Sequence, residues 1–425
     1  MNTEELKHIK QKALHWANQY DVCVLLDNNE SLNAYGLNHI EFAMAVGVKT
    51  SCIGKHENNF EALKKFRTEH ANQYSFGYFT YDLKNEVEAL QSNHFDGLEF
   101  PSLFFFVPEH LLLIDKNHQI IFESITYNSF AEWLNAAGNI NPTSESIAQK
   151  TNLQARVNKA DYLANVEKIK QHIIEGDVYE LNYCMEFFDN KAVINPTTVY
   201  TQLLEKSPVP FACYVKHGQQ YLLCASPERF ITKQDNVLYS QPIKGTIKRD
   251  LNNAANDLQL KNDLLNSEKE RAENLMIVDL VRNDLARVSK TGSVQVNEIF
   301  GIYSFKQVHQ MISTVSSRIK DDVPVTDAIK HAFPMGSMTG APKVMAMELI
   351  EQYEQTKRGL YSGAVGYFAP NGNFDFNVVI RSIQYNANNQ YLNIMVGGAI
   401  TYDSIAEQEY EECLLKAQAT MQVLQ

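Results

Sequence analysis

Residues 362–399 of the chain read SGAVGYFAPNGNFDFNVVIRSIQYNANNQYLNIMVGGA. Three β-rich runs, 362–370, 374–385 and 390–399, are separated by short polar segments, and the first turn is Pro370 to Asn373. Strands joined by turns this short pair antiparallel. The stretch therefore predicts a three-stranded meander. With helices interspersed elsewhere, it favours an α+β fold with antiparallel sheets over a parallel doubly wound fold.

The rest of the chain alternates between helical and strand patterns in the same way. Strands are expected at 22–26, at 102–107 and several times between 178 and 247. Helices are expected at 159–176, 257–288 and 326–332, from about Lys343 onward, and at 405–424. The Gly-, Asn- and Ser-rich stretch 138–153 reads as a connection. We therefore expect two regions, residues 1–150 and 151–425.

The composition excludes several classes of protein. The chain has 425 residues, 44% of them hydrophobic, and a formal net charge of −12, which argues against a general nucleic-acid binder. Its six cysteines show neither a Cys-x-x-Cys pair nor metal-ligand spacing, which is typical of reduced thiols. The polar N-terminus is unlike a secretory signal, and no apolar run has the length of a membrane span. We expect a cytoplasmic protein that is not bound to a membrane.

Lys244 is the most informative single residue. It lies in Gln241-Pro242-Ile243-Lys244-Gly245-Thr246, sixteen residues after Glu228 in Ser226-Pro227-Glu228-Arg229-Phe230. An amine among apolar neighbours can be desolvated enough to act as a nucleophile or base. The alternative is an exposed lysine at a strand end, held in a salt bridge.

Two pairs of glutamates have the spacing of metal ligands. Glu270 and Glu273 are three residues apart in one expected helix, and Glu409 and Glu412 are three apart in another. This spacing puts each pair on one helical face. Two such faces opposed to each other would suit Mg²⁺, whereas each pair alone is more typical of solvated surface. Spacing does not show whether the faces meet.

Weaker signals surround these residues. Each has an ordinary structural alternative: a helix-entry turn for the 333–343 loop with Ser337, a tight bend for Gly397-Gly398, a paired edge arginine for Arg381 and a satisfied core histidine for His309. The functional interpretations are a carboxylate-binding turn for the loop with Ser337 and a close approach of backbone to ligand for Gly397-Gly398. For Arg381 the functional interpretation is a buried anion clamp, and for His309 it is a proton shuttle.

Taken together, these segments resemble the chorismate-utilising enzymes. The matching segments occur in the family's order: 176–182, 226–230, 242–246, 271–284, 308–309, 336–343, 380–382, 397–398 and 409–416. Looser similarity covers 25–27 and 77–83. The resemblance implies an α+β fold with largely antiparallel sheets in a sandwich and helices packed outside.

Two positions sort the reactions of this family. Isochorismate and salicylate synthases have a general-base lysine where this chain has Glu180. The comparison with the family therefore argues against the activation of water at C2 by a lysine at this position. Anthranilate synthases usually have a small residue at the position of Lys244, whereas aminodeoxychorismate synthases have Pro-Ile-Lys-Gly-Thr, as here. The chain is most similar to the latter branch. It departs from it at 180–183, which reads Glu-Leu-Asn-Tyr where many relatives have Gln-Val-Asn-Leu.

The resemblance implies a role for each candidate residue. Mg²⁺ would be held by Glu273 and Glu412 directly, and by Glu270 and Glu409 through water. Lys244 would be the nucleophile, Glu228 the general acid, and His309 would orient the leaving-group side. Substrate binding would fall to Ser337, Tyr361, Arg381, Gly397, Gly398 and Lys416.

The resemblance also implies substrates and a partner. These are chorismate and ammonia, with ammonia supplied by a separate glutamine amidotransferase, since the sequence has no Gly-x-Cys-x-Gly nucleophile turn. The product would be 4-amino-4-deoxychorismate, on the path to p-aminobenzoate and folate. Two alternatives remain: an anthranilate synthase component, or an inert family member that acts as a partner subunit and would be expected to have lost a metal ligand or Glu228.

Overall fold

Two antiparallel sheets form the centre of the molecule, which is a computed structural model describing residues 1–29, 37, 39–55, 57–139 and 150–425. The larger sheet has the order β17 (Gly340–Ala341), β9 (Glu180–Asp189), β21 (Tyr391–Ile400), β20 (Ser382–Asn386), β11 (Gln220–Ser226), β10 (Phe211–His217), β1 (Val22–Asp27), β2 (Ile40–Val46), β6 (His110–Asp115), β7 (Ile120–Ser124), with β8 (Gln154–Ala155) paired to β9. The smaller sheet has the order β14 (Ile243–Lys248), β16 (Val308–Arg318), β13 (Val237–Gln241), β12 (Arg229–Gln234), β19 (Phe374–Asn377), β18 (Ala364–Phe368), β4 (Ser75–Phe79), β5 (Leu103–Val107), β3 (Thr50–Ile53), with β15 (Gln295–Ser304) paired to β16.

The two sheets pack face to face, because alternate side chains of their strands enter different cores. In β5, Phe104 and Phe106 enter a cluster that also holds Val24 and Val215 of the larger sheet. Phe105, between them, belongs to a second cluster on the outer face of the smaller sheet. This period of two is what an extended strand imposes. The expected sandwich is confirmed.

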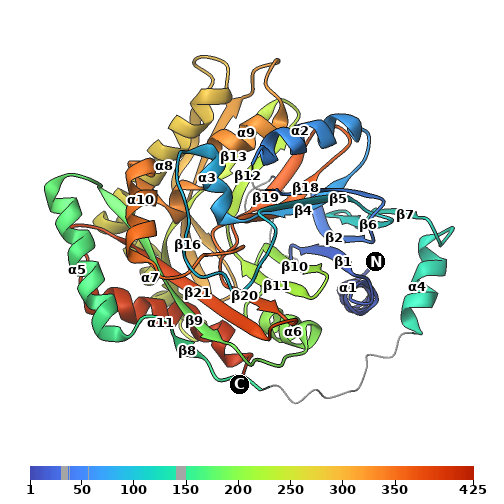
Figure 1. The fold of residues 1–425 in the computed structure, drawn as a ribbon, viewed down its shortest axis with the longest axis horizontal. Helices are drawn as coiled ribbons and strands as arrows, with labels where there is room; N and C mark the ends of the chain where they lie inside the picture. Colours follow the sequence, from blue (N-terminus) through green and yellow to red (C-terminus); the bar gives the residue numbers. More distant parts are fainter. Residues whose placement is uncertain (30–36, 38, 56, 140–149) are drawn as a thin grey trace.

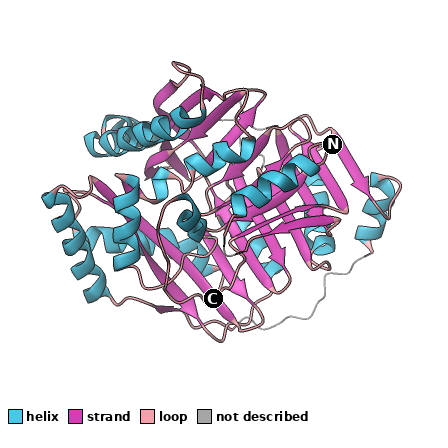
Figure 2. Cartoon of the chain, turned by 45° about the horizontal axis from the view of Figure 1, so that its top comes forward, coloured by secondary structure: helices cyan, strands magenta, loops and turns pink. Residues whose placement is uncertain are grey.

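Helices cover the outer faces of both sheets (Figures 1 and 2). The larger sheet shares its outer core with α1 (Thr3–Ala17), α4 (Phe130–Gly138), α5 (Lys159–Glu175), α6 (Pro196–Lys206), α10 (Lys343–Tyr353) and α11 (Ala406–Gln422). The smaller sheet shares its outer core with α2 (Asn59–Glu69), α8 (Glu268–Val288) and α9 (Val325–Ala332), while α7 (Ala254–Asn266) contacts β14 to β16. Three short elements are η1 (Tyr81–Leu83), α3 (Lys84–Val87) and η2 (Gly336–Met338). None of the helices in the described ranges is long and apolar enough to cross a membrane.

The predicted meander is correct in its turns but wrong in its middle strand. The run 374–385 is two strands in different sheets: β19 pairs with β18 in the smaller sheet, and β20 pairs with β21 in the larger one. Residues 378–381 cross between them, and Arg381 has a left-handed backbone at φ +53°. A continuous apolar run does not reveal such a crossing, because both halves are buried strands.

The helix predicted at 257–288 is likewise two helices. The break falls at Ser267, whose side chain accepts a hydrogen bond from the Glu270 backbone N–H and so caps α8. A serine in this position competes with helix continuation. The other expected helices are confirmed, including α5, which ends at Gly176 with φ +88°.

Both sheets combine strands from before and after residue 150, since β1 pairs with β10 and β4 pairs with β18. The two sequence regions are therefore interleaved within each sheet. The expected connection at 138–153 lies largely outside the described residues.

Candidate active site

Lys244 lies on the edge strand β14, and its amine faces a group of carboxylates. Burial lowers the pKa of Lys244, but nearby negative charges outweigh burial and raise the pKa above its usual value. These charges belong to Glu180, Glu273, Glu228 and Glu270. The apolar flanks of Lys244 therefore do not set its pKa alone, because distant elements bring carboxylates to its amine. Among the described residues, no hydrogen bond or ion pair within 4.0 Å occupies the Lys244 amine.

Glu228 follows β11 and is buried, with 5% of its surface exposed. Burial raises its pKa to about 7, although the Ser337 hydroxyl, the Lys244 charge and the Ile243 backbone N–H all favour the ionised form. Ser337 Oγ donates to Glu228 Oε1 at 2.8 Å. Both side chains line a pocket whose other lining residues include Ile277 and Val281 of α8. A carboxyl with this pKa can hold and release a proton near neutral pH.

Glu180, at the start of β9, is a site residue that was not assigned a role from the sequence. It is 1% exposed, and its Oε2 atom has no hydrogen-bond partner. Burial raises the pKa of Glu180, and the Lys244 charge opposes that rise. A charged residue at the head of an otherwise buried strand was the only signal available in the sequence.

The two glutamate faces meet. Glu270 and Glu273 on α8 interact electrostatically with each other, and Glu270 also interacts with Glu412 of α11. Burial and Glu273 raise the pKa of Glu270, while burial also raises that of Glu409. Burial acts in the same direction on Glu412, but the Lys416 ammonium at 2.6 Å outweighs it and lowers that pKa. Carboxylates that raise one another's pKa are short of positive charge.

Two structural features of the four glutamates fit Mg²⁺. Glu273 Oε1 is buried without a hydrogen-bond partner, an arrangement that is costly unless a ligand completes it. Gly398 leaves bare backbone beside the group: a Cβ there would lie 3.2 Å from Glu409 Oε2 and 3.7 Å from Glu412 Oε1. Within the described ranges, no three of the four glutamates bring ligand oxygens within 4.8 Å of one another. This spacing suits an ion that keeps several waters.

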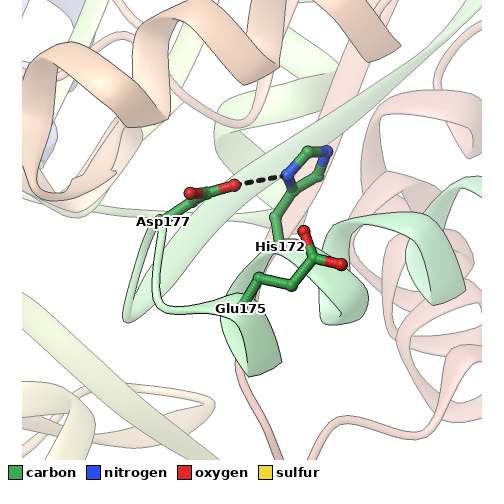
Figure 3. A group of neighbouring side chains, drawn as sticks. All are labelled: His172, Glu175 and Asp177. Atoms are coloured by element: carbon green, nitrogen blue, oxygen red, sulfur yellow. Dashed lines mark hydrogen bonds and ion pairs between the residues drawn. The ribbon is translucent and has the colours of Figure 1, made fainter.

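One other group does bring three possible ligands within that distance. It consists of His172, Glu175 and Asp177 at the end of α5 (Figure 3). Both ring nitrogens of His172 already have partners, Asp177 Oδ2 at 2.8 Å and the Tyr353 hydroxyl at 2.9 Å. This arrangement is a satisfied helix-end network, and it lacks an open ligand position.

The expected substrate-binding residues come from several elements. Gly397 and Gly398 lie on the larger sheet, Arg381 at the crossing, Lys416 on α11, Ser337 in η2 and Tyr361 in the turn before β18. Arg381 has no hydrogen bond or ion pair from its guanidinium among the described residues, and burial lowers its pKa while Tyr361 and Glu412 oppose that shift. Lys416 Nζ donates to the Gly397 carbonyl at 2.8 Å. Gly397 and Gly398 lie in β21 opposite Cys184 and Tyr183 of β9. These residues therefore surround the carboxylates on the α11 side.

His309 is placed differently from the other predicted catalytic residues. It lies on β16 and is 2% exposed. Its Nε2 contacts Asp257 Oδ1 at 3.1 Å, and its Nδ1 contacts Ser304 Oγ at 2.8 Å. Asp257 is in turn paired with Arg249 at 2.7 Å. No contact in the described structure joins His309 to Glu228 or Lys244, so its catalytic role stays a prediction.

Comparisons with known proteins agree with this architecture. The family described as chorismate binding enzyme matches residues 21–422. Aminodeoxychorismate synthase component 1 of Bacillus subtilis is 33% identical over 366 residues, which are 83% of this chain and 77% of that protein. Anthranilate synthase component 1 of Acetivibrio thermocellus is also 33% identical, over 82% of this chain and 74% of that protein.

A solved structure shows the same fold. Anthranilate synthase component I from Streptococcus pneumoniae has a TM-score of 0.76 and 26% identity, covering 89% of this chain and 91% of that one. Relatives named for two different reactions are thus similar to the chain. Overall identity does not choose between those reactions.

Proposed function

Because the chain belongs to the family of chorismate-binding enzymes, we propose that it is an aminodeoxychorismate synthase component 1, which replaces the C4 hydroxyl of chorismate with an amino group. The observation that carries this proposal is Lys244 in the sequence Pro-Ile-Lys-Gly-Thr, with Glu228 and Glu180 beside its amine. Lysine at this position is the feature that distinguishes the branch from anthranilate synthases.

The four glutamates of α8 and α11 would hold Mg²⁺, Glu273 and Glu412 directly and Glu270 and Glu409 through water. When bound, Mg²⁺ would supply the positive charge that receives the C1 carboxylate of chorismate. Lys416 orients Glu412 through their ion pair of 2.6 Å. Two observations support this assignment: Glu273 Oε1 is buried without a hydrogen bond, its nearest cation being Lys269 at 3.9 Å, and burial and Glu273 raise the pKa of Glu270.

The enolpyruvyl carboxylate would be bound by Arg381, Tyr361, Ser337 and the backbone amides near Gly397 and Gly398. Arg381 supports this role because its half-buried guanidinium makes no hydrogen bond or ion pair with another described residue. Guanidinium groups bind carboxylates with paired hydrogen bonds. These residues fix the ring so that C2 faces Lys244 and the C4 oxygen faces Glu228.

Catalysis would proceed in two displacements. The neutral Lys244 amine forms a bond to C2, and the two ring double bonds, C1=C2 and C5=C6, shift to C1=C6 and C4=C5. The C4–O bond breaks at the same time, and Glu228 gives its proton to the departing oxygen, which leaves as water. Ammonia then forms a bond to C4 and becomes a bound ammonium group, both double bonds shift back, and the C2–N bond breaks so that Lys244 leaves as a neutral amine. The result is covalent catalysis that divides one difficult substitution into two.

Lys244 must lose a proton before the first displacement, because its pKa is raised in the free protein. Neighbouring carboxylates provide acceptors for that proton. Glu228, with a pKa of about 7, keeps a proton in a large share of molecules at neutral pH. This division of one proton acceptor and one donor matches the needs of the first step.

We further propose that ammonia comes from a separate glutamine amidotransferase, as the name component 1 of the relatives suggests. All the proposed catalytic, substrate and metal residues lie between residues 180 and 416, within the expected catalytic region 151–425. The six cysteines are all free and buried, which supports a reducing, cytoplasmic setting.

Product identification tests the proposal. Incubation with chorismate, Mg²⁺ and ammonium should yield aminodeoxychorismate and no anthranilate. Anthranilate as the main product would overturn the proposal in favour of anthranilate synthase, the alternative that the Acetivibrio and Streptococcus relatives support. The absence of Mg²⁺-dependent turnover would favour an inert partner subunit.

Mass spectrometry tests the role of Lys244. With ammonia withheld, the wild-type chain should accumulate a covalent adduct with the substrate, and Lys244→Ala should not. Lys233→Ala is a matched control, since Lys233 is a buried strand lysine that bonds the Gly372 carbonyl. An adduct that persists in Lys244→Ala would contradict the nucleophile assignment.

A further inference from the structure

Arg358 is a buried arginine whose hydrogen bonds converge on the segment that carries Ser337. It is 1% exposed and lies after α10, in the segment that leads into Tyr361. Nη1 donates to the Met338 carbonyl at 2.8 Å and to Ser362 Oγ at 3.0 Å, and Nη2 donates to the Asn182 carbonyl at 3.0 Å. The guanidinium also stacks 4.4 Å from the Tyr81 ring centroid.

Glu354 fixes the orientation of that guanidinium. Its two oxygens accept from Arg358 Nε at 2.9 Å and Nη2 at 2.6 Å, which is a bidentate pair. Glu354 Oε1 also accepts from the Cys184 backbone N–H at 3.0 Å, which ties the pair to β9. Both residues are buried, so the pair is rigid and has little solvent to compete with it.

The Arg358–Glu354 pair fixes Ser337 through two of its neighbours, Met338 and Asn182. Arg358 holds the carbonyl of Met338, the next residue along η2. It also holds the Asn182 carbonyl, and the Asn182 side chain donates to the Ser337 carbonyl at 2.9 Å. Ser337 Oγ, fixed in this way, donates to Glu228 Oε1 at 2.8 Å. The chain of contacts runs without a gap from Glu354 to Glu228.

We infer that Arg358, oriented by Glu354, is a positioning residue that holds the Ser337 hydroxyl against Glu228. The inference rests on the proposed role of Glu228 as the general acid. The Arg358 guanidinium makes no hydrogen bond to Glu228 or to the side chain of a proposed substrate-binding residue, and it acts through Met338, Asn182 and Ser337. Loss of Arg358 should therefore change the pKa of Glu228. Loss of an arginine that only stabilised the fold would leave that pKa unchanged.

Few other charges bear on Glu228. Lys244 faces it from β14, and the Ile243 backbone N–H also favours its ionised form. Across the adjoining cavity, Asp284 of α8 is paired with Lys343 at 2.6 Å, and Arg229 is paired with Asp375 at 2.8 Å. None of these groups bonds to Arg358. A substitution of Arg358 should therefore change the pKa of Glu228 through Ser337.

The pH dependence of kcat/KM for chorismate loss tests the inference. The Ser337 hydrogen bond stabilises the ionised carboxylate, so losing it raises the pKa of Glu228 above about 7. In Arg358→Lys, the alkaline limb of the profile should move to higher pH, and the plateau should fall by roughly 10- to 100-fold. Ser337→Ala should move the limb in the same direction. The double variant should move it no further, because both changes remove the same contact.

Arg67 offers a matched control on α2. It too is buried, donates to backbone carbonyls and to a serine hydroxyl (Ser75 Oγ, 3.0 Å), and stacks on an aromatic ring, Phe368, at 5.1 Å. Its partners do not include Ser337 or Glu228. Arg67→Lys should lower the stability of the protein without moving the alkaline limb.

Glu354→Gln provides a second variant of equal size if Arg358→Lys does not fold. This substitution weakens the hydrogen bonds that orient Arg358. It should move the alkaline limb to higher pH by less than Arg358→Lys does. An unmoved limb in either folded variant, with stability lowered as in Arg67→Lys, would overturn the inference. The profile follows chorismate loss, so a chain that forms anthranilate would contradict the proposed function and leave this test intact.

Discussion

Two clusters of charged residues lie near Ser337, and they differ in whether their polar atoms have hydrogen-bond partners. In the cluster of Arg358 and Glu354, the guanidinium makes five hydrogen bonds, and the carboxylate accepts from Cys184 as well. In the cluster around Lys244, the amine has no direct partner in the described structure. Glu180 Oε2 and Glu273 Oε1 are buried there without hydrogen bonds.

The difference separates a scaffold from a binding site. Buried charge is tolerable when it is paired and fully hydrogen-bonded, and it is costly otherwise. The buried carboxylate oxygens without hydrogen bonds in the Lys244 cluster are therefore a cost that a cation and a substrate would relieve. Changes in the Lys244 cluster should remove activity and spare stability. Changes at Arg358 should lower stability strongly and lower activity by a smaller factor, through Ser337.

The largest expected effect is on turnover in Glu273→Gln. Removing one proposed direct ligand should reduce Mg²⁺-dependent chorismate turnover by roughly 10³-fold or more, equivalent to several kcal/mol. Thermal unfolding in the presence of a chelator should be unchanged or shifted upward, because a repelling charge is lost. Glu268→Gln, on an exposed position of the same helix, should leave both measurements unchanged. Retained activity with lowered stability would make this cluster a scaffold like the other.

The next effect is on stability in Arg358→Met. Leaving Glu354 buried without its partner should lower the free energy of unfolding by about 3–5 kcal/mol. Denaturant titration measures this loss. Lys159→Met removes an ion pair with Glu407 at the surface, where solvent screens the charges, and should lower the free energy of unfolding much less. Equal losses of unfolding free energy in the two variants would contradict the expectation that burial makes the Arg358–Glu354 pair more important for stability than a surface pair.

Glu228 links the two clusters, and its titration should appear in stability. Its folded pKa of about 7 lies above its ordinary value of 4.5, so the native state favours the protonated carboxyl. The contribution of that carboxyl to stability is complete below pH 4.5 and is lost as pH rises to about 7, by about 3 kcal/mol. Glu228→Gln should therefore match the wild type at low pH and exceed its stability at pH 8. Parallel stability curves at all pH values would show that Glu228 ionises normally.

Much of the fold was predictable because local signals agreed with tertiary packing. The turn at Pro370 to Asn373, the cap of α5 at Gly176 and the spacing of the glutamates along α8 and α11 all correspond to structural features. Helix faces can be read from a period of 3.6 residues, and here that period was sufficient to bring the carboxylates into register.

The rest depends on contacts that no local pattern contains. The crossing at Arg381 needs two sheets to be in place, and the raised pKa of Lys244 needs carboxylates from β9 and α8. Arg358 is in a short polar segment that reads as an ordinary loop, and its importance arises only when Met338 and Asn182 are folded against it. Sequence patterns can therefore nominate the charged residues of the candidate site, whereas the environment of each residue depends on the folded chain.

The smallest and most specific effect concerns Glu180, which sharpens the contrast within the Lys244 cluster. Glu180 is the first of the carboxylates that hold the pKa of Lys244 above its usual value, so Glu180→Gln should lower that pKa. Titration of the isotope-labelled, dimethylated Lys244 amine by NMR in metal-free protein measures it, with Lys244→Ala identifying the signal. Glu411→Gln, on the exposed side of α11, should leave the value unchanged. An unaltered pKa in Glu180→Gln would mean that Glu180 is already protonated in the native protein, as its own raised pKa allows. Proton acceptance from Lys244 would then fall to Glu228 or Glu273 instead.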